Sequence, residues 1–137
     1  MARPLRALSI FGTRPEAIKL APVLNLLKQT PAVESIVCIT AQHREMLDQV
    51  LRLFEIRPDF DLDIMRPAQP LAELSAAVFQ RLEPVLDEVA PDWVLVQGDT
   101  TTVMCAALLA YYHRVKIGHV EAGLRTGDKF QPFPEEV

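Results

Sequence analysis

The sequence predicts an α/β fold in which a parallel sheet carries helices on both faces. Short apolar runs of strand length alternate with segments of helical periodicity along the 137 residues, and this alternation is typical of right-handed βαβ crossovers. Half of the residues are hydrophobic and 23% are charged, which is the composition of a folded domain. A chain of this length can form one compact domain with its own core.

The first predicted strand, Leu5–Phe11, is an apolar run that stops at Gly12. The next residues, Thr13-Arg14-Pro15-Glu16, have the form of a capping box, in which Thr13 is the N-cap and Glu16 returns the hydrogen bond. A helix should therefore begin here. Its expected apolar positions are Ile18, Leu20, Val23, Leu24 and Leu27.

Apolar runs of strand length and segments of helical periodicity continue to alternate as far as Val120. Further strands are expected at Val33–Thr40, at Asp61–Met65 as a short strand, at Trp93–Gln97 and at Val115–Val120. Further helices are expected at Arg44–Phe54, at Leu71–Val89 with a kink or interruption at Pro84, and at Thr101–Tyr112.

Charge and cysteine content exclude several classes of protein. The net charge is −4 and the 14 basic residues are dispersed, so we expect no nucleic-acid surface. No segment approaches the roughly 18 uninterrupted apolar residues of a membrane span. Cys38 and Cys105 stand in apolar stretches and should be buried and reduced, and they are too few for a disulfide framework or a metal site. We expect a cytoplasmic protein.

The candidate site lies beyond the carboxyl ends of the strands, where open parallel α/β sheets bind ligands. The first strand is followed by Arg14 and then Lys19, the third clear strand by Asp99, and the fourth by Glu121. These charged side chains should converge on one crevice. Glycines at positions 98 and 123 would allow a ligand to approach the backbone closely.

Each of these residues also has a simpler interpretation. Asp99 could cap the helix that follows it, a contact worth about 1 kcal/mol. Glu121 could be an acid of a surface loop. Arg14 and Lys19 could be solvated charges, as charged side chains usually are.

The residue types at this edge favour proton transfer on a phosphorylated or nucleotide-linked substrate. A helix N-terminus and an arginine bind phosphate well, and paired carboxyls can act as acid and base when their pKa values differ. The sequence contains no Gly-x-Gly-x-x-Gly and no Walker loop, which argues against a dinucleotide enzyme or a P-loop NTPase. We expect no cofactor and no metal.

Several stretches of the chain form longer motifs. They are FGTRPEAIK at Phe11–Lys19, TAQHREMLD at Thr40–Asp48, GDTTT at Gly98–Thr102, GHVEAGLRTG at Gly118–Gly127 and PEE at Pro134–Glu136. Together they closely resemble the bacterial non-hydrolysing UDP-N-acetylglucosamine 2-epimerases. The resemblance implies the N-terminal half of a two-domain GT-B-type fold, built from two Rossmann-like halves that face a cleft. It also implies interconversion of UDP-GlcNAc and UDP-ManNAc, by elimination of UDP to a glycal and re-addition with C2 inverted.

The resemblance also assigns roles to residues. Arg14 and Lys19 look like contacts of the nucleotide diphosphate. The catalytic carboxylates would be Asp99, Glu121 and Glu135, of which Asp99 and Glu121 would also bind substrate. Gln42 and His43 lie where this family binds a second, regulatory UDP-GlcNAc, although His43 could equally bond backbone at a helix start. The full-length enzyme is expected to be a homodimer.

Members of this family are more than twice as long as this chain. Residues 1–137 would then be an incomplete N-terminal Rossmann-like domain, and the second domain would hold most of the uridine site. We therefore expect this chain alone to be inactive. The alternatives are a hydrolysing epimerase or a nucleotide-sugar glycosyltransferase of the same fold, or a half-domain that binds without turnover.

Overall fold

Strands and helices alternate along the chain in the computed structural model, which describes residues 3–41, 44–64, 66, 68–121, 127, 128 and 130. The elements are β1 Leu5–Phe11, α1 Arg14–Lys28, β2 Val33–Ile39, α2 Arg44–Leu53, β3 Phe60–Asp61, α3 Leu71–Val89, β4 Trp93–Gln97, α4 Thr101–Tyr112 and β5 Lys116–Val120. Within the described part of the chain, no helix combines the length and the apolar character needed to cross a membrane.

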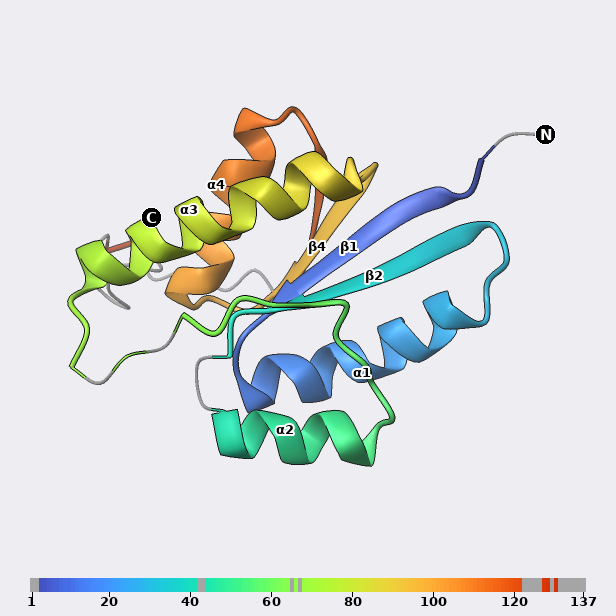
Figure 1. Ribbon diagram of the computed structural model, residues 1–137, viewed down its shortest axis with the longest axis horizontal. Helices are drawn as coiled ribbons and strands as arrows, with labels where there is room; N and C mark the ends of the chain where they lie inside the picture. The colour runs from blue at the N-terminus through green and yellow to red at the C-terminus, as the bar shows by residue number, and fades with distance from the viewer. Residues whose placement is uncertain are drawn as a thin grey trace.

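The strands form one parallel sheet in the order β3-β2-β1-β4-β5. Figure 1 shows β2, β1 and β4 side by side. From β1 the chain first builds outward through β2 and β3, and then crosses back to add β4 and β5 on the other side. The strand order therefore reverses between β1 and β4. In sheets of this kind, the ligand crevice lies outside the carboxyl ends of the strands at that reversal.

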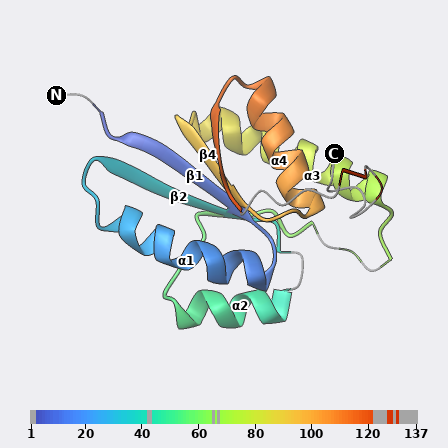
Figure 2. The same ribbon diagram turned by 180° about the vertical axis from the view of Figure 1, so that it is seen from behind.

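Helices cover both faces of the sheet, as the sequence predicts. α1 and α2 lie on one face and α3 and α4 on the other, in both views (Figures 1 and 2). The side chains of β1 alternate between the two layers: Leu8 and Ile10 pack with α3 and α4, and Phe11 packs with α1 and α2. Because both faces of this central strand are covered, its sequence is apolar rather than alternating.

The core positions of α1 differ from those expected. Ile18, predicted to be a core position, has 44% of its surface exposed. Leu20 and Leu24 are buried as predicted, and Ala17 and Ala21, which were not predicted, complete the buried apolar face. Small alanines let the helix backbone approach the sheet, so the buried face is centred between Ala17 and Ala21 and leaves Ile18 at its margin.

The predicted boundaries agree closely with the structure for the strand Trp93–Gln97 and the helix Thr101–Tyr112. The sequence predicted that Pro84 would kink or interrupt its helix. The helix is not interrupted, because α3 runs unbroken from Leu71 to Val89. Core contacts on both sides of Pro84, made by Leu82 and Val85, hold the helical path although proline removes a backbone hydrogen bond.

Candidate active site at the carboxyl edge of the sheet

Asp99 and Glu121 follow neighbouring parallel strands at the same edge of the sheet. β4 and β5 pair in parallel, and Gln97, the last residue of β4, lies opposite Val120, the last residue of β5. Glu121 comes directly after β5, and Asp99 comes two residues after β4. The predicted placement of Asp99 and Glu121 at the carboxyl ends of neighbouring strands is confirmed.

The turn after β1 contains the predicted capping box. The Thr13 hydroxyl accepts a hydrogen bond from the Glu16 amide at 3.5 Å. One oxygen of the Glu16 carboxylate accepts the amides of Gly12 at 2.9 Å and Thr13 at 3.3 Å. Both reciprocal hydrogen bonds of the capping box are therefore present at the N-terminus of α1.

Glu16 also reaches a second turn of the protein. Its other carboxylate oxygen accepts a 3.0 Å hydrogen bond from the Thr100 hydroxyl, and Thr100 is the N-cap of α4, where it accepts the Val103 amide at 3.4 Å. Glu16 is only 2% exposed. Burial raises the pKa of its carboxyl, against the opposing effect of the hydrogen bonds from Gly12, Thr100 and Thr13. One buried carboxylate thus connects the N-termini of α1 and α4.

Asp99 does not cap α4. Thr100 fills that position, so the simpler interpretation of Asp99 as a helix cap is wrong. Asp99 is exposed, and its carboxylate forms no hydrogen bond or salt bridge with another residue that the structure describes. The turn before it needs glycine, because Gly98 has a φ of +87°, a conformation that side chains rarely adopt. Asp99 is therefore presented outward by a specific turn.

Glu121 and His119 contact the same turn from β5. A Cβ atom added to Gly98 would lie 3.9 Å from Oε2 of Glu121 and 3.9 Å from Cγ of Glu16, so both acidic side chains border Gly98. The Nε2 atom of His119 lies 2.6 Å from the Gly98 carbonyl oxygen. A carbonyl can only accept, so Nε2 of His119 carries the proton.

The predicted cations lie on α1. Arg14 is its first residue and Lys19 follows in the second turn. Both are exposed, and within the described part of the chain neither forms a hydrogen bond or salt bridge. The structure therefore places the exposed Arg14 side chain at the N-terminus of α1, which follows the carboxyl end of β1. Gln42, His43 and Glu135 lie outside the described residues, and their roles stay predictions.

Sequence reasoning missed the contacts of Glu16, Thr100 and His119. The capping-box pattern already explained Glu16, and nothing local indicated a bond to a residue 84 positions away. A signal existed for Thr100, since threonine is a favoured N-cap. The histidine stands inside β5, where the strand pattern predicts pairing and says nothing about the neighbouring turn.

A different group of titratable side chains lies at the opposite edge of the sheet. Among the described residues, Glu83, Asp87 and His113 are the group whose possible ligand atoms lie within 4.8 Å of one another. Nε2 of His113 is 2.8 Å from Glu83, whereas Nδ1 is 3.9 Å from Asp87. Glu83 and Asp87 are exposed and face different ring nitrogens, and this group is separate from the candidate site.

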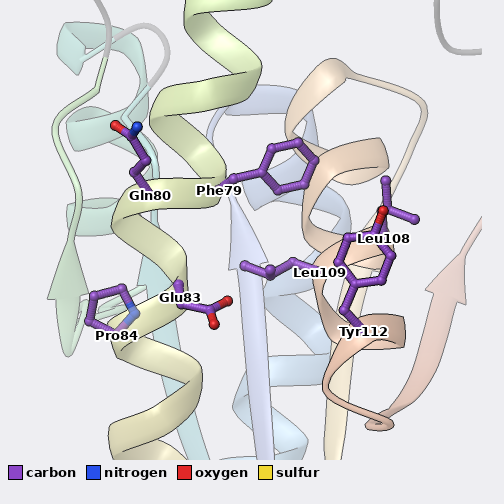
Figure 3. A pocket seen from close by; sticks show the side chains of 7 residues that line it. All are labelled: Phe79, Gln80, Glu83, Pro84, Leu108, Leu109 and Tyr112. Carbon is purple, nitrogen blue, oxygen red and sulfur yellow. The ribbon is translucent and has the colours of Figure 1, made fainter.

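An apolar groove of about 500 Å³ lies between α3 and α4 (Figure 3). Its lining residues are Phe79, Gln80, Glu83, Pro84, Leu108, Leu109 and Tyr112. The groove is on the helical face rather than at the carboxyl edge, and it includes none of the predicted site residues. It is therefore separate from the candidate site.

Comparison with known proteins agrees with this arrangement. Residues 25–137 match the family described as UDP-N-acetylglucosamine 2-epimerase. The UDP-N-acetylglucosamine 2-epimerase of Yersinia pestis is 62% identical over 133 residues, which are 97% of this chain and 35% of the relative. The crystal structure of UDP-GlcNAc 2-epimerase from Neisseria meningitidis bound to UDP-GlcNAc is 55% identical with a TM-score of 0.90, over 96% of this chain and 36% of that one.

The fold extends beyond close relatives. A solved structure of the glycotransferase of kitacinnamycin is 10% identical with a TM-score of 0.63, over 96% of this chain and 34% of that one. This likeness concerns the fold alone and supports the GT-B-type assignment. The chain spans about a third of the length of the curated relatives it matches. From the family match over residues 25–137, this chain belongs to the UDP-N-acetylglucosamine 2-epimerase family.

Proposed function

We propose that the whole protein interconverts UDP-GlcNAc and UDP-ManNAc by eliminating UDP and adding it back. The observation that carries this proposal is the position of Asp99 and Glu121, which follow adjacent strands beside the N-terminus of α1. The relatives' names agree with it, and the Neisseria meningitidis relative is described as bound to UDP-GlcNAc.

The reaction needs a proton to leave C2 of the sugar and return on the opposite face. In the first step, one carboxylate takes the C2 proton while the C1–O bond breaks, so that UDP leaves with the bonding electrons and a C1–C2 double bond forms. In the second step, a UDP phosphate oxygen adds to C1 while an acid delivers a proton to C2 from the other face. Asp99, Glu121 and Glu135 are the groups that we propose for these transfers.

Arg14 and Lys19 are proposed to bind the diphosphate and to stabilise its charge as UDP leaves. The carboxylate of Glu16 already occupies the amides of Gly12 and Thr13 at this helix N-terminus. Phosphate recognition must therefore depend on the Arg14 and Lys19 side chains more than on those two amides. The exposure of both cations supports this role.

The remaining proposals concern the whole protein. Residues 1–137 would form an N-terminal Rossmann-like domain that faces a second domain, and the complete enzyme would be a homodimer without a nucleic-acid partner. Gln42 and His43 would contact a regulatory UDP-GlcNAc. The buried free thiols of Cys38 and Cys105 fit a reducing compartment such as the cytoplasm. We expect no turnover by this chain alone, because a site with one wall excludes water poorly.

NMR of UDP-GlcNAc in deuterated water tests the activity with the whole protein. We expect UDP-ManNAc to form and deuterium to appear at C2. Release of free N-acetylmannosamine would instead show a hydrolysing epimerase, and turnover only with an added acceptor would show a transferase. Absence of any turnover, with UDP-GlcNAc bound, would identify a binding protein.

A further inference from the structure

We infer that Glu16 is a positioning residue for the Gly98–Thr100 turn, and that its bond to Thr100 sets the place of the Asp99 carboxylate. The inference rests on the proposed function, in which Asp99 acts on the sugar. Glu16 itself is buried and is not assigned any contact with substrate.

The hydrogen bonds of Glu16 show what it connects. One carboxylate oxygen holds the amides of Gly12 and Thr13, and the other holds the Thr100 hydroxyl at 3.0 Å. These partners belong to the turns after β1 and β4, which are the two turns on either side of the point where strand order reverses. Glu16 therefore fixes the distance between the cationic turn and the turn that carries Asp99.

The energetics also separate this carboxylate from an ordinary helix cap. A capping carboxylate can remain exposed and still bond the helix amides, whereas burying a charged group is costly. The Glu16 side chain is 2% exposed and uses its second oxygen for a residue 84 positions along the chain. The cap alone does not require that burial, but a bridge between two turns does.

The Asp99 turn is held at both ends. His119 donates to the Gly98 carbonyl at 2.6 Å on one side, and Glu16 accepts from Thr100 on the other. Asp99 lies between these two contacts, and its carboxylate bonds to none of the other described residues. Its position is consequently decided by the backbone of the turn, which the two contacts fix.

The first experiment is steady-state epimerase kinetics on the whole protein. Glu16→Ala and Thr100→Val should each lower kcat by roughly 10²-fold, the loss expected for about 1 Å of misplacement of a reacting group, with KM changed only a few-fold. The double variant should lose little more than either single variant, because the Glu16–Thr100 bond is already absent in each of them. Val89→Ala, a core change at the opposite edge of the sheet, controls for lost stability and should keep kcat.

Conservative variants separate positioning from proton transfer. Glu16→Gln keeps an acceptor for Gly12, and its amide can donate to the Thr100 oxygen, so it should retain most of the kcat that Glu16→Ala loses. Thr100→Ser keeps the hydroxyl and should do the same. If Glu16→Gln were as slow as Glu16→Ala, or if Glu16→Ala kept full kcat, the positioning role would be wrong.

Amide hydrogen exchange tests the bridge without any turnover. In the whole protein, Glu16→Ala should speed exchange of the Val103 amide, which bonds the Thr100 hydroxyl. The Leu74 amide at the start of α3, bonded to the Pro70 carbonyl, should not change. Unchanged exchange at Val103 would overturn the bridge. If wild-type protein formed no UDP-ManNAc, the proposed function would be wrong. The exchange rate of the Val103 amide would still show whether Glu16 holds Thr100 in place.

Discussion

The Thr100 hydroxyl donates a 3.0 Å hydrogen bond to the buried carboxylate of Glu16, 84 residues away in sequence. This contact joins the N-cap of α4 to the capping box of α1. The two helices lie on opposite faces of the sheet (Figure 1), so their first turns meet only at its carboxyl edge. The turn that carries Arg14 and the turn that carries Asp99 are thereby joined through one carboxylate.

The stability of the protein should depend on the ionisation of Glu16. Burial raises the pKa of this carboxyl, so the folded chain binds the proton more tightly than the unfolded chain does. The contribution of this group to the free energy of unfolding is fully present below the unfolded pKa and is lost as pH rises through the folded pKa. Glu16→Gln should flatten this part of the curve. Urea unfolding at a series of pH values measures it.

The matched control for that prediction is Glu88→Gln, which changes an exposed carboxyl near the end of α3. It controls for the replacement of an acid by an amide at an exposed helical position. The free energy of unfolding could instead show the same pH dependence in Glu16→Gln and in wild type over the whole pH range measured. That result would contradict the link between Glu16 burial and stability.

Arg14→Ala should weaken binding of UDP to the whole protein by about 1.5–3 kcal/mol, the usual worth of a hydrogen bond to a charged group. Arg14 is exposed at the N-terminus of α1, where a phosphate is also favoured by the helix dipole. Titration calorimetry with UDP measures the change. Lys28→Ala, in the last turn of the same helix, removes a charge far from this end and should bind normally. If Arg14→Ala and Lys28→Ala bound UDP with equal affinity, Arg14 would be a solvated charge without a role in binding.

Asp99→Asn and Glu121→Gln should each slow epimerisation by the whole protein roughly 10²–10⁴-fold, as expected on loss of a general acid or base. Both substitutions preserve the size of the side chain and remove its ability to transfer a proton. Deuterium incorporation at C2, followed by NMR, reports the rate. Asp87→Asn, at the opposite edge near His113, is the control. Full activity in both site variants would remove these carboxylates from the mechanism.

The two cysteines should not react with thiol reagents in the folded protein. Cys38 and Cys105 are fully buried. Burial raises the pKa of Cys38 to about 12 and also raises the pKa of Cys105, so neither forms the thiolate that reacts. A disulfide-exchange reagent should label both after unfolding in urea. Rapid labelling at neutral pH without urea would show that one of these sites opens.

Local sequence was enough to predict much of this protein. The alternation of apolar runs and helical periodicity predicted the parallel sheet with helices on both faces, and the capping box predicted where α1 begins. Because parallel strands end at one edge, the same pattern brought Asp99 and Glu121 together. The sequence motifs from Phe11–Lys19 to Pro134–Glu136 were sufficient to indicate the family. These features depend on interactions between residues close in sequence, or on a repeating backbone geometry that every parallel sheet shares.

The tertiary structure decided the rest. It selected Thr100 rather than Asp99 as the cap of α4, brought His119 onto the Gly98 carbonyl, and gave Glu16 its second bond. Periodicity reports which side of an element is buried, but a contact between two turns depends on strand order, register and the packing of both layers. A buried side chain can bond only the partners that this packing brings within about 3 Å, and those distances exist only once the whole sheet has formed.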